Sequence, residues 1–172
     1  WRRAGADPLA PKILCAPEST NLMMPNLIFF NPHSIRRKKE ECIRVIRDSG
    51  VKLLFGFPLL VFDLLWMLKS EGVSDITFDA AIVSGHVVSS GVRSFIKNNF
   101  GCAVFDYYGA GEIGPIAAEC EAHNGLHIQE ENTIVEIVDA YGKPVPPGTA
   151  GKVLITTLSN EVMPFIRYDI GD

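Results

Sequence analysis

The sequence predicts an α/β fold, in which a mostly parallel sheet flanked by helices is followed by a small β-rich, barrel-like subdomain. Over residues 1–124, short apolar runs typical of buried strands alternate with helical patterns, and such alternation is typical of parallel sheets covered by helices. After Asn124-Gly125 the helical patterns stop, and strand-like runs follow one another with only turns between them. We therefore expect an α/β part over residues 1–124 and a β-rich subdomain over residues 125–172.

Residues that begin and end helices bound the helical patterns of the first part. Ser34 is a candidate N-cap, and Gly50 is a candidate stop for the same helix. Ser89 or Ser90 is a candidate cap for a later helix, which Gly101 would end. The predicted elements are, in order, strands over 12–16 and 26–30, a helix over 34–49, a strand over 51–57, a helix over 59–69, a strand over 79–84, a helix over 92–100 and a strand over 102–107.

The second part has the pattern of strands joined by turns. A Pro-rich stretch over residues 143–148 is typical of a turn between two strands. The predicted strands cover residues 126–128, 133–138, 152–158 and 165–168.

Length and composition are those of an ordinary globular protein. A chain of 172 residues accommodates one domain, or one domain with a small appendage. Hydrophobic residues make up 47% and charged residues 21%, so the chain can bury a core. Sixteen basic residues against twenty acidic ones leave a formal net charge of −4, which disfavours contact with phosphate backbones. We therefore expect no nucleic-acid partner.

The cysteine pattern indicates a reducing compartment. The chain has four cysteines that stand far apart, without the spacing of a disulfide framework. We therefore expect a cytoplasmic protein with free thiols. The four residues are Cys15, Cys42, Cys102 and Cys120.

The most apolar stretch of the chain, residues 53–68, does not predict a membrane span. Gly56, Pro58 and Asp63 interrupt it before it reaches the roughly 18 clean residues that a spanning helix needs. The chain also opens abruptly on Trp-Arg-Arg and stops at Ile-Gly-Asp. This pattern leads us to expect a fragment of a longer protein.

A glycine-rich segment follows the strand predicted at 102–107. Gly109, Gly111 and Gly114 spell G-x-G-x-x-G, and we expect the segment to open a helix whose free N–H groups approach a phosphate. A dinucleotide site is disfavoured, because a β-rich segment follows and because Glu112 would repel a pyrophosphate. A Mg²⁺ ion between carboxylate and phosphate would remove that repulsion. A loop packed for structural reasons alone is the other alternative.

Four segments of the chain resemble motifs of one enzyme family. Tyr-Gly-Ala-Gly-Glu at 108–112 resembles the Tyr-Gly-x-Thr-Glu motif of adenylate-forming enzymes, the acyl-CoA synthetase and AMP-ligase superfamily. Ser-Gly-His at 84–86 stands where that family has its adenine-side glycine loop. Residues 142–148 resemble the family's hairpin, and residues 163–172 resemble its Tyr-Arg-Thr-Gly-Asp segment. This last segment is most similar to the phenylacetate–CoA ligase and CapK-like branch.

The resemblance implies roles for the residues at matching positions. It places Tyr108 against adenine and Asp106 at the edge of the base, beside the glycine loop. It places Asp172 on both ribose hydroxyls and makes Glu112 the catalytic residue that holds Mg²⁺. The nucleotide-binding residues implied in this way are Gly85, His86, Asp106, Tyr107, Tyr108, Gly109, Gly111 and Asp172.

The chain departs from the family pattern at several positions. Gly111 stands where the family has a Thr whose hydroxyl contacts the α-phosphate, Asp169-Ile170 replaces an Arg-Thr pair, and Lys152 stands where Glu is commoner. No Ser/Thr/Gly-rich phosphate loop is present, and the chain ends before the small C-terminal domain whose lysine completes adenylation. We therefore expect these 172 residues alone to show no ligase turnover while keeping affinity for AMP.

A second candidate site has the pattern Cys-x-x-His-x-x-x-His. Cys120, His123 and His127 offer the sulfur and nitrogen ligands that zinc accepts. A fourth ligand is not obvious from the sequence. The alternative is a free cysteine near two surface histidines.

The resemblance implies that the chain is the central part of an ATP-dependent ligase. Such an enzyme activates a small carboxylic acid, an aryl acid among the candidates, as an acyl-AMP and then passes the acyl group to CoA. ATP or AMP, Mg²⁺ and CoA are the implied cofactors. The alternative, from a different class, is a catalytically inactive module that binds AMP or associates with another chain through exposed apolar faces.

Overall fold

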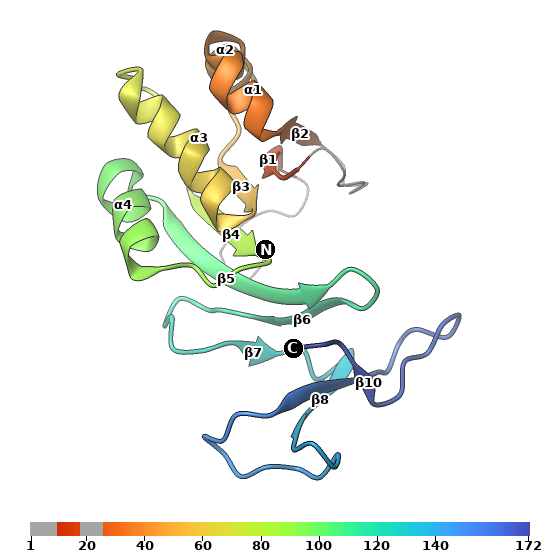
Figure 1. Ribbon diagram of the computed structural model, residues 1–172. Helices are drawn as coiled ribbons and strands as arrows, with labels where there is room; N and C mark the ends of the chain where they lie inside the picture. Colours follow the sequence, from red (N-terminus) through yellow and green to blue (C-terminus); the bar gives the residue numbers. More distant parts are fainter. Residues whose placement is uncertain (1–9, 18–25) are drawn as a thin grey trace. The chain divides into compact units, whose positions relative to one another are not determined.

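The computed structural model describes residues 10–17 and 26–172, which fall into two compact units (Figure 1). The first unit runs to Tyr107 and also contains the segment Glu119–Gly125. The second unit consists of Tyr108–Ala118 and Leu126–Asp172. The predicted boundary near residue 125 remains a prediction about domain organisation.

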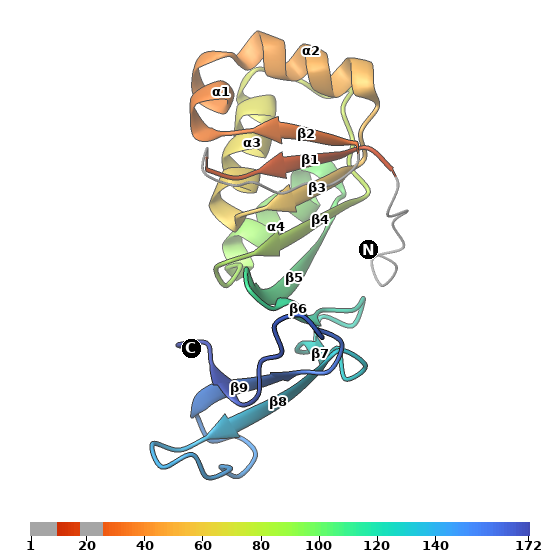
Figure 2. The ribbon, with the colours of Figure 1, turned by 90° about the vertical axis from the view of Figure 1, so that its right-hand side faces the viewer.

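Five parallel strands lie side by side in the first unit, in the order β2-β1-β3-β4-β5 (Figure 2). With β6 (Gly114–Ala118) and β7 (His127–Ile128) they make a seven-stranded, mostly parallel sheet, which confirms the predicted fold class. The strands of the first unit are β1 (Lys12–Cys15), β2 (Leu27–Phe30), β3 (Leu53–Gly56), β4 (Ala80–Ser84) and β5 (Ala103–Ala110), the last of which continues into the second unit.

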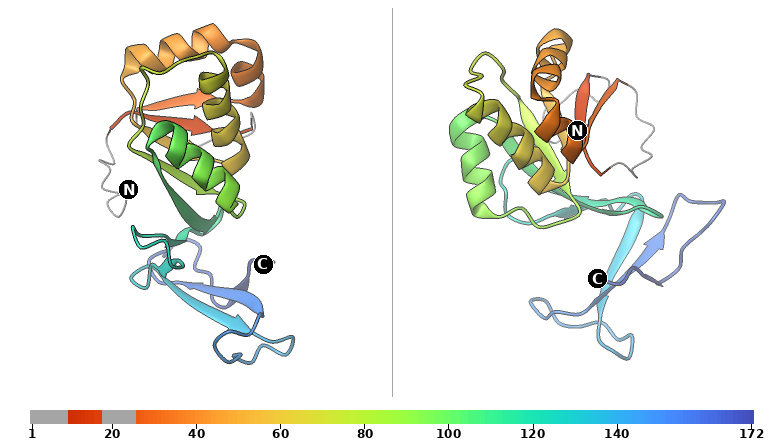
Figure 3. Two further views of the ribbon diagram at one scale, coloured as in Figure 1. Left: turned by 90° about the vertical axis from the view of Figure 1, so that its left-hand side faces the viewer. Right: turned by 45° about the horizontal axis from the view of Figure 1, so that its top comes forward.

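Helices α1 (Pro32–Arg37) and α2 (Lys39–Ser49) contribute Ile35, Cys42 and Ile46 to the core beside the sheet. Two further helices cover one face of the sheet and pack into the same core (Figure 3). They are α3 (Pro58–Ser70) and α4 (Ser90–Phe100). Because α3 is apolar on more than one face, it packs against α1, α4 and the strands β1, β3 and β4 at once. Among the largest fully buried side chains are Leu54, Leu64, Leu65, Leu68 and Ile96. Of the helices in the described residues, none is long and apolar enough to cross a membrane.

The helix predicted over 34–49 is two helices, α1 (Pro32–Arg37) and α2 (Lys39–Ser49), so that prediction is wrong in its start and its continuity. Asn31 is the N-cap, because its side chain accepts a 2.8 Å bond from the Ser34 amide while the Ser34 hydroxyl accepts from the Asn31 amide. This reciprocal pair is a capping box. Lys38, with φ −121° and ψ 43°, leaves the helical region and separates the two helices. Gly50 ends α2 in the left-handed conformation, as predicted.

The other predicted boundaries of the first unit agree with the structure to within a few residues. Ser89 caps α4, because its hydroxyl accepts from the Val92 amide at 3.3 Å. Gly101 ends that helix with φ 63°, a conformation that glycine adopts without steric cost.

The helix expected after the glycine-rich segment is absent. The segment therefore lacks the free N–H groups of a helix N-terminus that were expected to approach a phosphate. Strand β5 continues to Ala110, a short turn follows, and the chain enters β6 (Gly114–Ala118). The turn is closed by a 3.2 Å bond from the Ile113 amide to the Ala110 carbonyl. Gly114, with φ +86°, supplies the backbone conformation at the start of β6. No helix N-terminus is therefore available here to an anion.

Over its described residues, the second unit contains strands and turns but no helix, and its small antiparallel sheet lies in the part of the chain for which strands joined by turns were predicted. It contains β6, β7 (His127–Ile128) and an antiparallel sheet of β10 (Tyr168–Asp169), β9 (Lys152–Thr157) and β8 (Thr133–Val138). Strand β8 covers the residues predicted for it, whereas the strand predicted at 165–168 lies at 168–169. The buried side chains of Ile116, Ala117 and Ile155 form the core of this unit.

Candidate functional site

The first unit holds four of the predicted nucleotide-binding residues, which lie where the pairing of the parallel strands β4 and β5 ends: Gly85, His86, Asp106 and Tyr107. Strands β4 and β5 pair in register, with Val83 opposite Asp106 and Ser84 opposite Tyr107. The Gly85-His86 loop therefore begins where β4 ends, beside β5. The carboxyl edge of a parallel sheet is where open α/β folds bind ligands.

Gly85 meets a steric requirement for glycine in this loop. Its φ is +87°, and a Cβ atom there would lie 2.6 Å from a ring carbon of Phe57. The His86 ring lies 6.1 Å from the Phe57 ring, centroid to centroid. The backbone of the loop thus lies against an aromatic side chain, and a residue with a Cβ would require the Phe57 ring or the loop to shift.

The half-buried Asp106 is held close to the backbone of its own strand. Its Oδ1 accepts a 2.9 Å bond from the Tyr107 amide, and burial raises the pKa of its carboxyl above the ordinary value. The Tyr107 ring packs edge-to-face on Phe55, with centroids 6.2 Å apart, and burial raises the pKa of its hydroxyl. Tyr107 therefore packs on the sheet, while Asp106 keeps a carboxylate on β5 beside the end of β4.

The raised pKa of Asp106 predicts that Asp106→Asn increases stability at pH 7. A carboxyl whose pKa is higher in the folded chain loses stability as pH rises from its unfolded pKa through its folded pKa. We expect the free energy of unfolding of Asp106→Asn to exceed that of the wild type at pH 7, and the difference to shrink towards about pH 3, below the ordinary pKa of Asp. Urea unfolding at both pH values measures this. The exposed Glu121→Gln is the control, and an equal difference at both pH values would contradict the prediction.

The second unit brings together Tyr108 and Asp172, which are 64 positions apart in the sequence. The Tyr108 hydroxyl donates a 2.5 Å hydrogen bond to Asp172 Oδ2. Partial burial and the Asp172 carboxylate together raise the pKa of Tyr108, so this hydroxyl stays protonated at neutral pH. The backbone of Asp172 is held as well, because its carbonyl accepts from the Val153 amide at 3.1 Å.

Glu112 lies in the turn after β5 and meets Tyr168 of β10. The Tyr168 hydroxyl donates to Glu112 Oε1 at 3.1 Å, and Glu112 is exposed. An exposed carboxylate steadied through one oxygen is a suitable single ligand for Mg²⁺, which is bound through one or two carboxylates together with phosphate and water. Glu112 therefore fits a magnesium ion that arrives with a nucleotide.

The two remaining glycines of the predicted site differ in their surroundings. Gly109 is half-buried on β5. Gly111 lies in the turn, outside the left-handed region, and nothing lies within 4 Å of the position that a Cβ atom would take there. A larger side chain fits at Gly111 without a clash.

The segment that matches known proteins covers most of the chain. A family model described as "AMP-binding enzyme" matches residues 26–164. The chain belongs to this family of AMP-binding enzymes.

Relatives of the AMP-binding family are similar over the same region. The phenylacetate-coenzyme A ligase of Thermus thermophilus is 30% identical over 139 residues, which make up 77% of this chain and 31% of that protein. The phenylacetate-coenzyme A ligase of Escherichia coli is 29% identical over 140 residues, or 77% of this chain and 32% of that protein. The chain thus spans about a third of the length of these curated relatives.

Solved structures show the family fold over nearly the whole chain. A 2-hydroxyisobutyryl-CoA ligase in complex with 2-HIB-AMP and CoA matches with a TM-score of 0.79 and 18% identity, over 99% of this chain and 42% of that chain. A benzoate CoA ligase from Burkholderia xenovorans LB400 matches with a TM-score of 0.63 and 14% identity, over 93% of this chain and 38% of that chain. At these identities the likeness establishes the fold.

The zinc hypothesis receives no support from the geometry of this AMP-binding family member. Cys120 and His123 belong to the first unit, and His127 belongs to the second. His123 instead contacts Glu119, with Nδ1 3.1 Å from Oε2, and its ring lies 5.1 Å from the Phe105 ring. Within residues 10–17 and 26–172, no group of three or more His, Cys, Asp or Glu side chains is arranged to hold a metal ion.

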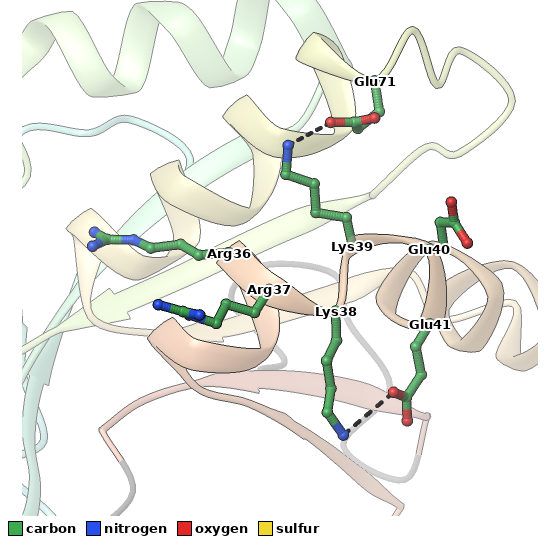
Figure 4. A pocket seen from close by; sticks show the side chains of 7 residues that line it. All are labelled: Arg36, Arg37, Lys38, Lys39, Glu40, Glu41 and Glu71. Atoms are coloured by element: carbon green, nitrogen blue, oxygen red, sulfur yellow. Dashed lines mark hydrogen bonds and ion pairs between the residues drawn. The ribbon is translucent and has the colours of Figure 1, made fainter.

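An open pocket in the first unit lies apart from the predicted residues, at the junction of α1 and α2 (Figure 4). Its lysines are already paired, Lys39 with Glu71 at 2.6 Å and Lys38 with Glu41 at 3.4 Å. Because these acids offset the basic charge, the pocket offers an anion little net attraction. Its lining residues are Arg36, Arg37, Lys38, Lys39, Glu40, Glu41 and Glu71.

Sequence reasoning assigned no role to two residues that the structure places against the site. Tyr168 contacts Glu112, and Glu119 contacts the backbone of Asp106. Tyr168 lies in the segment that resembles the family motif. Glu119 could have been suspected as an acid that follows directly after the apolar run at 116–118.

Proposed function

We propose that this chain is the nucleotide-binding part of an ATP-dependent ligase that activates a small carboxylic acid and transfers it to CoA. Membership of the AMP-binding enzyme family supports the nucleotide, and similarity to proteins named phenylacetate-coenzyme A ligase supports an aryl acid and CoA. The chemistry has two steps. The acid's carboxylate oxygen attacks the α-phosphorus and expels pyrophosphate, and the CoA sulfur then attacks the acyl carbon and expels AMP.

The contact between Tyr108 and Asp172 is the observation that carries this proposal. Residues of two separate motifs, one assigned to adenine and one to ribose by the family resemblance, meet within one unit, although 64 positions separate them. An aromatic ring suits stacking on a flat base, and a carboxylate can accept bonds from both hydroxyls of a ribose. Glu112 would hold Mg²⁺, which supplies positive charge for the phosphates when it is bound.

In the first unit, the proposed contacts are those to the edge of adenine. Asp106 accepts hydrogen bonds, and adenine presents a donor at its exocyclic amine, whereas guanine presents an oxygen at that position. The Gly85-His86 backbone, seated on Phe57, would line the same edge. The proposed site therefore prefers adenine to guanine.

Calorimetry with AMP and with GMP on the 172-residue chain tests the proposal. We expect binding of AMP with a clear preference over GMP. Pyrophosphate release by the full-length protein, with ATP, Mg²⁺ and a panel of aryl and aliphatic acids, then tests the chemistry, because the 172 residues alone are expected to show no turnover. Equal binding of the two nucleotides, or none of either, would contradict the proposed site.

The glycine at position 111 favours a second candidate function, that of a module that binds AMP without catalysis. The family's Thr hydroxyl at the α-phosphate is missing there. AMP binding without pyrophosphate release for any acid of the panel would select this candidate over the ligase.

The open space at Gly111 leads to a gain-of-affinity prediction. We expect Gly111→Thr to bind AMP about tenfold more tightly, because its hydroxyl can donate to a charged phosphate oxygen. Adenosine, which has no phosphate, should bind both proteins equally. Calorimetry measures both ligands, with Gly111→Ala as the matched control. A gain that also appears with adenosine, or with the Ala variant, would show that the hydroxyl is not responsible.

A further inference from the structure

A nearly buried carboxylate beside the candidate site receives donors from three separate elements of the first unit. Glu119 is 9% exposed. Arg93 of α4 reaches both of its oxygens, with Nη1 3.0 Å from Oε2 and Nη2 3.2 Å from Oε1. The Asp106 amide of β5 donates to Oε2 at 2.8 Å, and His123 Nδ1 lies 3.1 Å from the same oxygen.

These contacts keep Glu119 charged in a site that water scarcely reaches. Burial alone would raise the pKa of its carboxyl, but bonds from the Asp106 amide, His123 and Arg93 outweigh burial and hold the pKa below the ordinary value. A carboxylate paired with arginine in this two-point geometry is also fixed in orientation. Glu119 is therefore a rigid acceptor at neutral pH.

The same residue holds both polar groups of the Asp106 backbone. The Asp106 amide donates to the Glu119 side chain, and the Asp106 carbonyl accepts from the Glu119 amide at 2.9 Å. Arg93 additionally donates to the carbonyl of Val104, two residues earlier on β5. The strand is thus fixed at Asp106, and with it the place from which the Asp106 carboxylate projects.

We infer that Glu119, held by Arg93, is a positioning residue for adenine recognition, which acts by fixing the Asp106 carboxylate at the edge of the base. This inference rests on the proposed function. A hydrogen-bonding site discriminates between adenine and guanine only when its acceptor is held in place. A mobile carboxylate can reorient to suit either purine or to bind water instead. Loss of the Glu119 contacts therefore lowers the preference for adenine over guanine.

The ratio of the GMP and AMP dissociation constants tests this role. A fall in the folded fraction lowers the number of binding sites but leaves that ratio unchanged. The ratio therefore distinguishes a loss of Asp106 positioning from a loss of folded protein. We expect the wild type to prefer AMP by at least about tenfold and Glu119→Ala by less than about threefold. Glu119→Gln keeps an acceptor for the Asp106 amide but loses the charge that Arg93 pairs with. We expect its ratio of dissociation constants to lie between those of the wild type and Glu119→Ala.

Glu121→Gln is the matched control, because it neutralises an exposed carboxylate in the same segment, and its ratio should equal that of the wild type. If Glu119→Ala does not fold, Arg93→Lys replaces it, because lysine keeps the charge but not the two-point contact, and the same loss of preference is expected. A wild-type ratio in the folded Glu119→Ala variant, or in the Arg93→Lys variant that replaces it, would overturn this inference alone. Failure of the wild type to bind AMP would overturn the proposed function and this inference with it.

Discussion

Tyr108→Ala should bind AMP about tenfold or more weakly than the wild type. Stacking of a base on an aromatic ring contributes about 1–3 kcal/mol, which corresponds to roughly five- to 150-fold in affinity. Calorimetry on the folded variant measures the loss. The affinity for GMP, where its binding is detectable, should fall as well, because stacking on an aromatic ring is largely independent of the base.

Tyr108→Phe separates the ring from the hydroxyl in this prediction. It keeps the stacking surface and removes the donor that bonds to Asp172 at 2.5 Å, which leaves that carboxylate ready to receive the ribose hydroxyls. We expect Tyr108→Phe to keep AMP affinity within about threefold of the wild type, because the ring that stacks on the base is retained and the lost bond lies within the protein. If Phe and Ala reduce affinity equally, the hydroxyl and not the ring makes the contact.

Gly56→Ala should destabilise the fold by about 3–5 kcal/mol, which combines overpacking with backbone strain. Gly56 ends β3 directly opposite Cys15 of β1, and an added Cβ would lie 2.0 Å from the Cys15 carbonyl oxygen. Its φ of +145° is also unfavourable for any residue with a side chain. Because the obstacle is backbone in the centre of the sheet, it cannot turn away as a side chain would. Urea unfolding followed by circular dichroism measures the loss.

Gly50→Ala is the control for the steric part of this prediction. Gly50 also has positive φ, +59°, but nothing lies within 4 Å of its Cβ position. We expect a cost of about 1–2 kcal/mol there, the penalty for left-handed backbone alone. If Gly56→Ala costs no more than Gly50→Ala, the close approach of β1 and β3 does not limit this position.

Local sequence patterns were sufficient to predict most helices and strands of the fold. Gly50 and Gly101 end helices because glycine occupies the left-handed conformation freely, a property that depends on the residue itself. Strand β8 matches its predicted residues because its apolar pattern and flanking turns are contiguous in sequence. The helix predicted at 34–49 failed at its start because Asn31 and Ser34 compete for the same capping role, and the reciprocal bonds between them decide it.

The glycine-rich segment shows where local patterns are insufficient. Three glycines after a strand are compatible with a helix N-terminus or with a turn between strands. The chain takes the turn, and β5 continues through Ala110 into a neighbouring strand. Strands β5 and β6 flank this turn and lie next to each other in the sheet, so the pairing of the two strands decides between the alternatives, whereas the glycine pattern alone does not.

The sequence by itself determined the fold class, most of the strand and helix order outside the glycine-rich segment and, through the motif resemblance, which residues to consider for a nucleotide. The tertiary structure alone decided their partners: Tyr108 with Asp172, Glu112 with Tyr168, and Asp106 with Glu119. Hydrophobic periodicity and helix caps depend on residues a few positions apart, which is why they can be predicted from the sequence. A hydrogen bond between residues 13, 56 or 64 positions apart forms only when the folded chain brings donor and acceptor within about 3 Å.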